Sequence, residues 1–245
     1  MPEINTLITG VMSWALYSCI LIQRFSYARP VNNNKTPSSS LPGLKIKQKR
    51  SQDTYDTLVK TAFQLLRNRE LESISIAELT KAAGYSVGAF YARFQSKDEF
   101  MHALVDHHVK TRQATHDYLF SKYSGIDLIY KFIENVVKYI AKNRGFWQSS
   151  LARSTRDPKF WKPMRALALE TGTLYLDSIR NEIGRDLTDA EELNIRFAFQ
   201  VTFGTINNSV INRPGPLQMN NPEYIEKLSR AFCLISDYDN LVGSH

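Results

Sequence analysis

The stretch Ser73–Phe100, SISIAELTKAAGYSVGAFYARFQSKDEF, decides the fold of this 245-residue chain. It has the pattern of two short helices joined by a tight turn at Gly84 and followed at once by a third helix. That order is a helix-turn-helix, whose second helix enters the major groove of DNA. We therefore expect a DNA-binding unit here.

Helix-start signals flank the turn on both sides. Ser75 stands three residues before Glu78, and Ser96 three before Glu99. This spacing predicts a capping box, in which the hydroxyl accepts from a first-turn amide and the carboxylate reaches back to the cap. Ser86 can cap the middle helix. Glycine at position 84 suits the left-handed backbone that ends a helix.

A longer amphipathic helix precedes this unit. Apolar side chains recur at helical spacing, which predicts a helix from about Gln52 to Arg69. Phe90 and Phe94 lie four residues apart and share a face. The small core expected between the three helices consists of Leu58, Phe63, Leu79, Phe90 and Phe94.

From about Lys49 to Ala103 the chain resembles the TetR family of bacterial transcriptional regulators. The segment Ala82–Glu99, AAGYSVGAFYARFQSKDE, looks like that family's turn, recognition helix and start of the next helix. The resemblance implies an all-α homodimer in the cytoplasm. A helical effector-binding domain would control the DNA-binding half. It also implies a double-stranded DNA operator as partner, and repression as the usual mode of regulation.

The DNA contacts follow by position from this resemblance. Ser86, Val87 and Ala89 would face bases, while Tyr91 and Lys97 would contact phosphates. Lys97 also lies in a first helical turn, where free amides favour a phosphate. The alternative is a packing role for Tyr91 and a solvated Lys97. The full DNA-binding set is Lys47, Lys49, Arg50, Ser75, Tyr85, Ser86, Val87, Ala89, Tyr91 and Lys97.

Charge is distributed unevenly around this unit. The chain carries a net charge of +7, of which +4 falls on residues 45–112 and +1 on residues 113–245. Lys45, Lys47, Lys49 and Arg50 crowd into six residues, and such a cluster can neutralise phosphates or reach a minor groove. We predict three parts: an N-terminal extension and linker (1–44), the DNA-binding domain (45–97) and a helical effector-binding and dimerisation domain (98–245).

Residues 1–44 leave three interpretations open. Leu7–Ile22 is an uncharged, mostly apolar run, shorter than the roughly 20 residues that span a membrane, and Asn32–Gly43 is a polar, Pro/Ser-rich linker. The three are a membrane anchor, a poorly ordered arm and a start codon assigned too early. The late beginning of the resemblance favours the last, so we expect no membrane association.

Periodicity predicts further helices after the DNA-binding unit: Lys97–Tyr123, Ile126–Ala141, one from near Phe146, one from Asp157-Pro158 to Ile183 with a start delayed by Pro163, one from Thr188 to Asn212 and one from Pro222. The last two carry apolar residues, Phe197, Val201, Gly204 and Thr205 on one, Leu228 and Phe232 on the other. The resemblance implies that these helices form the dimer interface, although packing inside one subunit is equally consistent. An unknown small-molecule effector would contact Tyr139, Phe146, Trp147, Trp161 and Tyr175, each of which also suits a core.

Gly84-Tyr85-Ser86-Val87-Gly88 matches the G-x-S-x-G elbow of α/β-hydrolases, which makes an esterase the enzyme alternative. That elbow needs a strand before the serine, and the sequence predicts a capped helix there, so we expect no enzymatic activity. A membrane-tethered DNA binder without an effector is a third class. His102, His107 and His108 share a helix, but we expect a polar surface there and neither metal nor cofactor.

Overall fold

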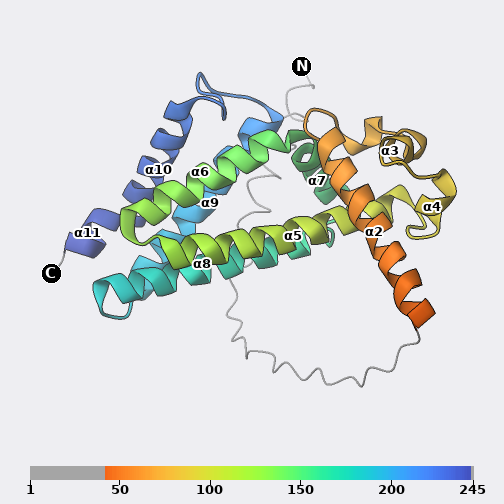
Figure 1. Cartoon of the computed structure of the whole chain (residues 1–245). Helices are drawn as coiled ribbons and strands as arrows, with labels where there is room; N and C mark the ends of the chain where they lie inside the picture. The colour runs from red at the N-terminus through yellow and green to blue at the C-terminus, as the bar shows by residue number, and fades with distance from the viewer. Residues whose placement is uncertain (1–41, 244–245) are drawn as a thin grey trace, which may run out of the picture. The chain divides into compact units, whose positions relative to one another are not determined.

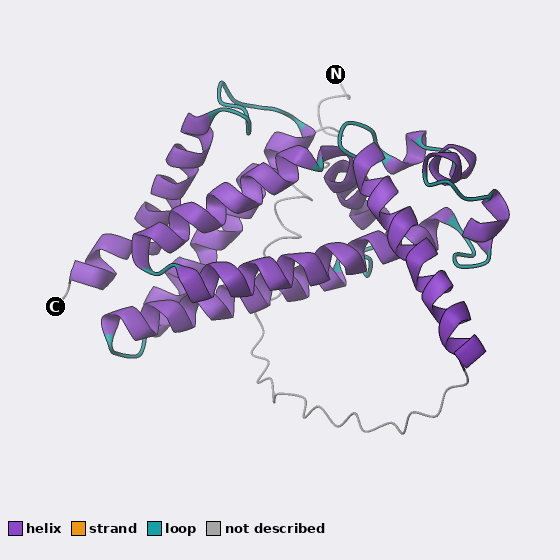
Figure 2. Ribbon diagram, viewed as in Figure 1, coloured by secondary structure: helices purple, strands orange, loops and turns teal. Residues whose placement is uncertain are grey.

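The computed structural model describes residues 42–243, with side chains from Ser51 onward, and every regular element in that range is helical (Figures 1 and 2). The helices of the first part are α2 (Pro42–Leu65), the short 3-10 turn η1 (Leu71–Ser73), α3 (Ile76–Ala82) and α4 (Val87–Tyr91). Those of the second part are α5 (Lys97–Lys122), α6 (Gly125–Lys142), α7 (Arg144–Arg156), α8 (Lys162–Ile183), α9 (Asp189–Ile211), α10 (Pro222–Ser236) and α11 (Tyr238–Gly243).

Aromatic packing fixes the first part. The Phe90 side chain of α4 is fully buried, and its ring centroid lies 5.2 Å from that of Phe94 and 5.3 Å from that of Phe100. Tyr55 of α2 packs on Phe94 at 5.7 Å. The predicted core is confirmed for Leu58, Leu79, Phe90 and Phe94, each at most 3% exposed; Phe63 is half-buried. A helix as short as α4 is not stable alone. The helix is therefore stabilised by the packing of Phe90 in this core.

Long helices run alongside one another in the second part. In Figure 1, α5 and α8 lie side by side. Helix α10 packs against both α6 and α9. The inner faces are almost wholly apolar; on α6 they include Leu128, Phe132, Val136 and Ile140, all buried. This arrangement leaves one face of α9 uncovered, as described below.

Most helix boundaries follow the sequence signals, and two helices, α2 and α11, differ from the prediction. Helix α2 begins at Pro42, well before Gln52, and ends at Leu65. Helix α8 starts only at Lys162, with Pro163 in its first turn, as the delayed start predicted. Helix α11 was not expected.

The capping boxes predicted at Ser75 and Ser96 are incomplete. Ser75 accepts a hydrogen bond from the Glu78 amide at 3.0 Å, but the Glu78 carboxylate pairs with Arg69. Ser96 accepts from the Glu99 amide at 3.1 Å, while the carboxylate of Glu99 accepts from the amide of Gln95 at 2.6 Å. Both carboxylates accept hydrogen bonds from donors other than the amide of the cap residue. The predicted capping by the hydroxyls is therefore confirmed, and the predicted return contact of the carboxylates is wrong.

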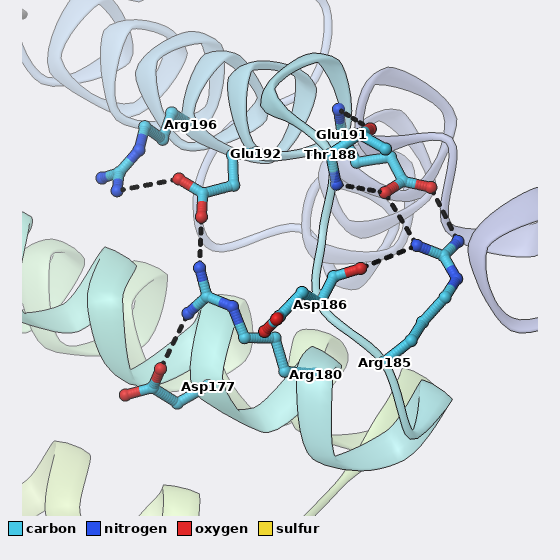
Figure 3. A network of polar contacts seen from close by, with 8 residues as sticks. All are labelled: Asp177, Arg180, Arg185, Asp186, Thr188, Glu191, Glu192 and Arg196. Carbon is cyan, nitrogen blue, oxygen red and sulfur yellow. Dashed lines mark hydrogen bonds and ion pairs between the residues drawn. The ribbon is translucent and has the colours of Figure 1, made fainter.

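The complete capping box lies at the connection between α8 and α9, inside a polar network (Figure 3). Glu191 accepts from the Thr188 amide at 2.7 Å and from both guanidinium nitrogens of Arg185 at 2.8 and 3.0 Å. The Arg185 hydrogen bonds lower the pKa of Glu191 to about 2. Arg180 of α8 also pairs with Glu192 of α9. The ends of the two helices are therefore linked by side chains as well as by the loop.

The described residues from Lys45 onward belong to one compact unit. The boundary proposed at residue 97 falls at the start of a continuous helix, α5, and stays a prediction. Residues 1–41, with the apolar run Leu7–Ile22 and most of the predicted extension, lie outside the described residues. Within the described part, no helix has the length and apolar character needed to cross a membrane.

Candidate nucleic-acid interface

Helix α4 turns one face to the core and the other to solvent. Phe90 is buried, whereas Val87 is 40% and Tyr91 54% exposed. Ser86 and Gly88 are exposed too, and Ala89 is half-buried. The exposed face therefore combines small side chains, which admit a close approach to base edges, with one tyrosine at the helix end.

Ser86 begins α4 through its side chain. Its hydroxyl oxygen accepts from the Ala89 amide at 3.1 Å. The hydroxyl hydrogen is left for an outside acceptor such as a phosphate or a base. Ser86 is thus both the cap that orients α4 and an exposed donor beside it.

The turn before α4 is tight and fixed by the backbone. Gly84 has φ of +75°, and the Tyr85 amide donates to the Thr80 carbonyl at 2.8 Å. Tyr85 is half-buried and Ser75, the cap of α3, is exposed. These two predicted DNA contacts flank α3 at its two ends.

The remaining predicted DNA contacts are basic residues at the start of α5 and within α2. The Lys97 ammonium donates to the Glu72 carbonyl at 3.2 Å, and burial lowers its pKa. An ammonium has three donors, so this contact leaves two for a phosphate. The predicted basic residues Lys47, Lys49 and Arg50 lie within α2, and their side chains are outside the description. Their roles and that of Lys97 stay predictions.

The hydrolase elbow is not formed. Helix α3, not a strand, precedes Ser86, and the Ser86 hydroxyl contacts a backbone amide rather than a histidine. A nucleophilic serine needs an adjacent base. Within the described residues the G-x-S-x-G match is a helix-turn-helix turn with a capping serine.

The start of α7 is packed directly against the end of α2. The Phe146 amide donates to the Leu66 carbonyl at 3.2 Å, and the Leu71 amide donates to the Ser149 hydroxyl at 2.8 Å. A Cβ on Gly145 would lie 2.0 Å from the carbonyl oxygen of Arg69. We call this contact the α2–α7 joint. Because the Arg69 side chain pairs with Glu78 of α3, the joint leads from the second part of the chain to the helix-turn-helix.

Four of the five aromatic residues predicted to contact an effector form one group. His108 of α5 lies against Tyr139, Phe146 and Trp147, with ring centroids 5.2 to 5.5 Å apart. Trp147 also packs on Trp161 at 5.9 Å. The fifth, Tyr175, packs elsewhere, against Phe199 and Phe232. Their roles in binding stay predictions.

Sequence reasoning overlooked a polar row inside the second part. His108, Arg112 and His116 follow one another at four-residue spacing on α5, and all three are at most 6% exposed. His108 was expected on a polar surface, which is wrong; His102 and His107 are indeed exposed. The spacing i, i+4, i+8 was visible in the sequence, and it is the signal that could have identified the row.

The two histidines of this polar row make hydrogen bonds to uncharged hydroxyl groups. His108 Nδ1 lies 2.9 Å from the Tyr139 hydroxyl, and His116 Nδ1 lies 2.8 Å from the Thr171 hydroxyl. Burial, reinforced by the positive charge of Arg112, lowers the pKa of His108 to about 3 and that of His116 to about 4. Both histidines are therefore neutral at pH 7.

The last helices divide their apolar residues between core and surface. Leu228 and Phe232 of α10 are at most 7% exposed and pack inside the subunit. On α9, Phe197 is 50% exposed, Gly204 and Thr205 are exposed, and Val201 is half-buried. Other exposed apolar residues are Leu193 and Ile211 of α9 and Leu234 of α10. An interface through Leu228 and Phe232 is thus excluded by their burial, whereas the α9 face is uncovered.

Comparison with known proteins agrees with this geometry. The family model described as "Bacterial regulatory proteins, tetR family" matches residues 58–104. A curated relative, the HTH-type transcriptional regulator YwcC of Bacillus subtilis (strain 168), is 38% identical over 53 residues, and the match spans 22% of this chain and 24% of that protein.

Solved structures show the same fold over most of the chain. A TetR-family regulator from Streptomyces coelicolor aligns with a TM-score of 0.56 at 18% identity, covering 79% of this chain and 86% of that one. GusR of Salmonella enterica aligns with a TM-score of 0.56 at 15% identity, covering 76% and 96%. At these identities the likeness concerns the fold alone. With the family model and the curated relative, it leads to one conclusion: residues 58–104 match the DNA-binding domain of the TetR family of transcriptional regulators, within a chain that has the fold of such regulators.

Proposed function

We propose that this protein is a homodimeric repressor that binds a DNA operator through α4 and releases it when a small molecule binds the second part of the chain. The observation that carries the DNA-binding role is the two-sided α4, with Phe90 buried and Val87 and Tyr91 exposed. On this proposal the protein acts in the cytoplasm on the bacterial chromosome, and neither catalysis nor a membrane is involved.

Genomic footprinting identifies the operator, and fluorescence anisotropy then measures its affinity against salt. Tyr91→Phe removes only a hydroxyl, so we expect affinity to fall by up to about tenfold, equally for all sequences, because one hydrogen bond to a phosphate is lost. Tyr118→Phe on α5 is the matched control, since Tyr118 is 55% exposed and distant in sequence. Equal affinities for the two variants would show that the Tyr91 hydroxyl makes no contact with a phosphate.

Lys97→Met tests the predicted phosphate contact of that lysine. A contact to one phosphate contributes about 0.9 to the slope of log affinity against log salt. We expect the slope to flatten by that amount, with sequence preference unchanged. An unchanged slope would show that the contact with the Glu72 carbonyl is the whole role of Lys97.

Dimerisation is proposed through the uncovered face of α9 and the exposed end of α10. A two-fold dimer would present its α4 helices to major grooves about one helical turn, ~34 Å, apart. Phe197→Glu places a charge in that face and should give a monomer in analytical ultracentrifugation. Leu169→Glu is the control, because Leu169 is 62% exposed on α8, outside the face. If the wild-type protein is a monomer at micromolar concentration, the proposed dimer is refuted.

Release of DNA requires that an effector bind the two states of the protein unequally. The α2–α7 joint is the physical link by which such a preference could reach α3 and α4. It lies directly beside the aromatic group, since Phe146 takes part in both. This adjacency supports an effector site near Tyr139, Phe146, Trp147 and Trp161.

A further inference from the structure

Arg112 is a buried cation that has no carboxylate partner in the part of the chain that the structure describes. Its side chain is 6% exposed, one guanidinium nitrogen, Nη2, donates to the Asn135 side-chain oxygen, and Cζ lies 4.6 Å from the centre of the Tyr139 ring. No ion pair within the described residues includes Arg112. Arg180, by contrast, is 30% exposed and pairs with two carboxylates. Burial of an unpaired charge is unfavourable.

No described group that contacts Arg112 neutralises its charge. His108 and His116 are neutral at pH 7, and burial raises the pKa of Tyr139 to about 12, so its hydroxyl is neutral too. Burial lowers the pKa of Arg112, but a guanidinium stays charged at neutral pH. The interior row thus carries one uncompensated positive charge.

The guanidinium also has unused donors. Its Nε and Nη1 donate to no described residue, and the only fully buried side-chain nitrogen or oxygen left unpartnered in residues 51–243 is the Tyr175 hydroxyl. Four of the five N–H donors of the guanidinium therefore have no acceptor among the described residues. The second hydrogen of Nη2 forms a fork with an adjacent N–H of Nη1 or Nε, and a carboxylate, which accepts from two such N–H groups at once, is the best fit to that fork.

The surface beside the fork is aromatic. Tyr139 lies under the guanidinium, and its hydroxyl contacts His108, which packs on Phe146 and Trp147. Given the ligand-responsive regulator proposed above, on which this step rests, we propose that Arg112 is the anion-binding residue of the effector site and that the effector is a small aromatic carboxylate. Binding would supply the missing negative charge and place a ring against Tyr139 and Trp147.

Matched acid and amide pairs test the ligand class on the full-length protein. Benzoate, 4-hydroxybenzoate, phenylacetate and cinnamate are each compared with the corresponding primary amide by thermal shift and calorimetry, with inorganic phosphate as a second anion. We expect at least one acid to raise the melting temperature while its amide does not. In Arg112→Gln, affinity for that acid should fall 10- to 100-fold, the usual effect of losing hydrogen bonds to a charged group. No acid surpassing its amide, equal binding by the variant, or stabilisation by phosphate equal to that by the acids would overturn the proposal.

Stability without ligand gives an independent measurement. If Arg112 is retained for binding, Arg112→Met should leave the melting temperature unchanged or raise it, because a buried unpaired charge is removed. Arg180→Met should lower it, because two carboxylates lose their partner. A larger drop for Arg112→Met than for Arg180→Met would assign Arg112 a structural role and contradict the inference.

Operator binding separates this inference from the function on which it rests. If the acids bind through Arg112 but leave operator affinity unchanged, repression by effector release fails while the anion site stands. If a neutral compound alone releases the operator and no acid binds, the anion site fails while the repressor stands.

Discussion

Gly145→Ala is the sharpest perturbation of the α2–α7 joint. A Cβ at this position would lie 2.0 Å from the Arg69 carbonyl oxygen, 2.6 Å from its carbonyl carbon and 2.7 Å from the Leu66 carbonyl oxygen. All three are backbone atoms, so no side-chain rotation relieves the clash. Since real Cβ contacts do not fall below 3.0 Å, α7 must move by ~1 Å relative to the end of α2.

Such a movement has a calculable effect on stability. It strains or breaks two hydrogen bonds, from the Phe146 amide to the Leu66 carbonyl and from the Leu71 amide to the Ser149 hydroxyl. Each contributes about 1 kcal/mol to stability. Overpacking adds ~1–3 kcal/mol, and the better helix propensity of alanine returns up to ~1 kcal/mol. We expect the free energy of unfolding to fall by ~2–5 kcal/mol, with operator affinity reduced even where the protein is folded.

Urea denaturation followed by circular dichroism measures this change. Gly172→Ala is the control, because its Cβ would meet nothing within 4 Å inside α8; that variant should gain up to ~1 kcal/mol from helix propensity. If Gly145→Ala unfolds within ~0.5 kcal/mol of wild type, which is the usual range for inert surface changes, the joint is not closely packed and the reasoning fails.

Three further predictions concern other sites. Tyr175→Phe should leave the free energy of unfolding unchanged or raise it by ~1 kcal/mol, since its buried hydroxyl has no partner; Tyr224→Phe should lower it by ~1 kcal/mol, because that hydroxyl bonds Ser209 at 3.0 Å, and denaturant titrations showing the reverse order would refute this. The folded pKa values of His108 and His116, about 3 and 4, lie below the unfolded value near 6.5, so the unfolded chain binds protons that the folded chain excludes. Between pH 7 and pH 5 each histidine should therefore remove ~2 kcal/mol of stability; His116→Gln should halve that loss, and a stability curve flat over this range would contradict both burials. Gly84→Ala, at φ of +75° with no neighbour within 4 Å, should destabilise by ~1 kcal/mol through backbone strain alone, and a neutral result in urea would show that the turn relaxes.

Much of the fold could be predicted because each helix start carries a local signal. Ser96 and Thr188 cap α5 and α9 at the expected residues. The extra helix α11 was missed because α10 ends at Asp237, which adopts left-handed φ of +55° where the usual signal is glycine. Local rules failed where a non-glycine residue makes the turn.

In the candidate sites too, features set by local sequence patterns could be predicted, and features set by tertiary packing could not. The exposed and buried faces of α4 followed from the spacing of Phe90 and Phe94, which is a local pattern. Arg112 was overlooked because a charged residue on a helix is by default assigned to solvent. Its partners Asn135 and Tyr139 belong to another helix, α6, and only tertiary packing brings them together.

The α2–α7 joint is made largely of main-chain atoms, and this has a consequence for how such a regulator can be altered. The Leu66 and Arg69 carbonyls and the Phe146 amide are present whatever side chains those residues carry. Only the size of residue 145 and the hydroxyl of Ser149 constrain the sequence. On the proposed function, the lining of the interior can therefore be redesigned for another ligand, residue by residue, while the connection to α3 and α4 is left as it is.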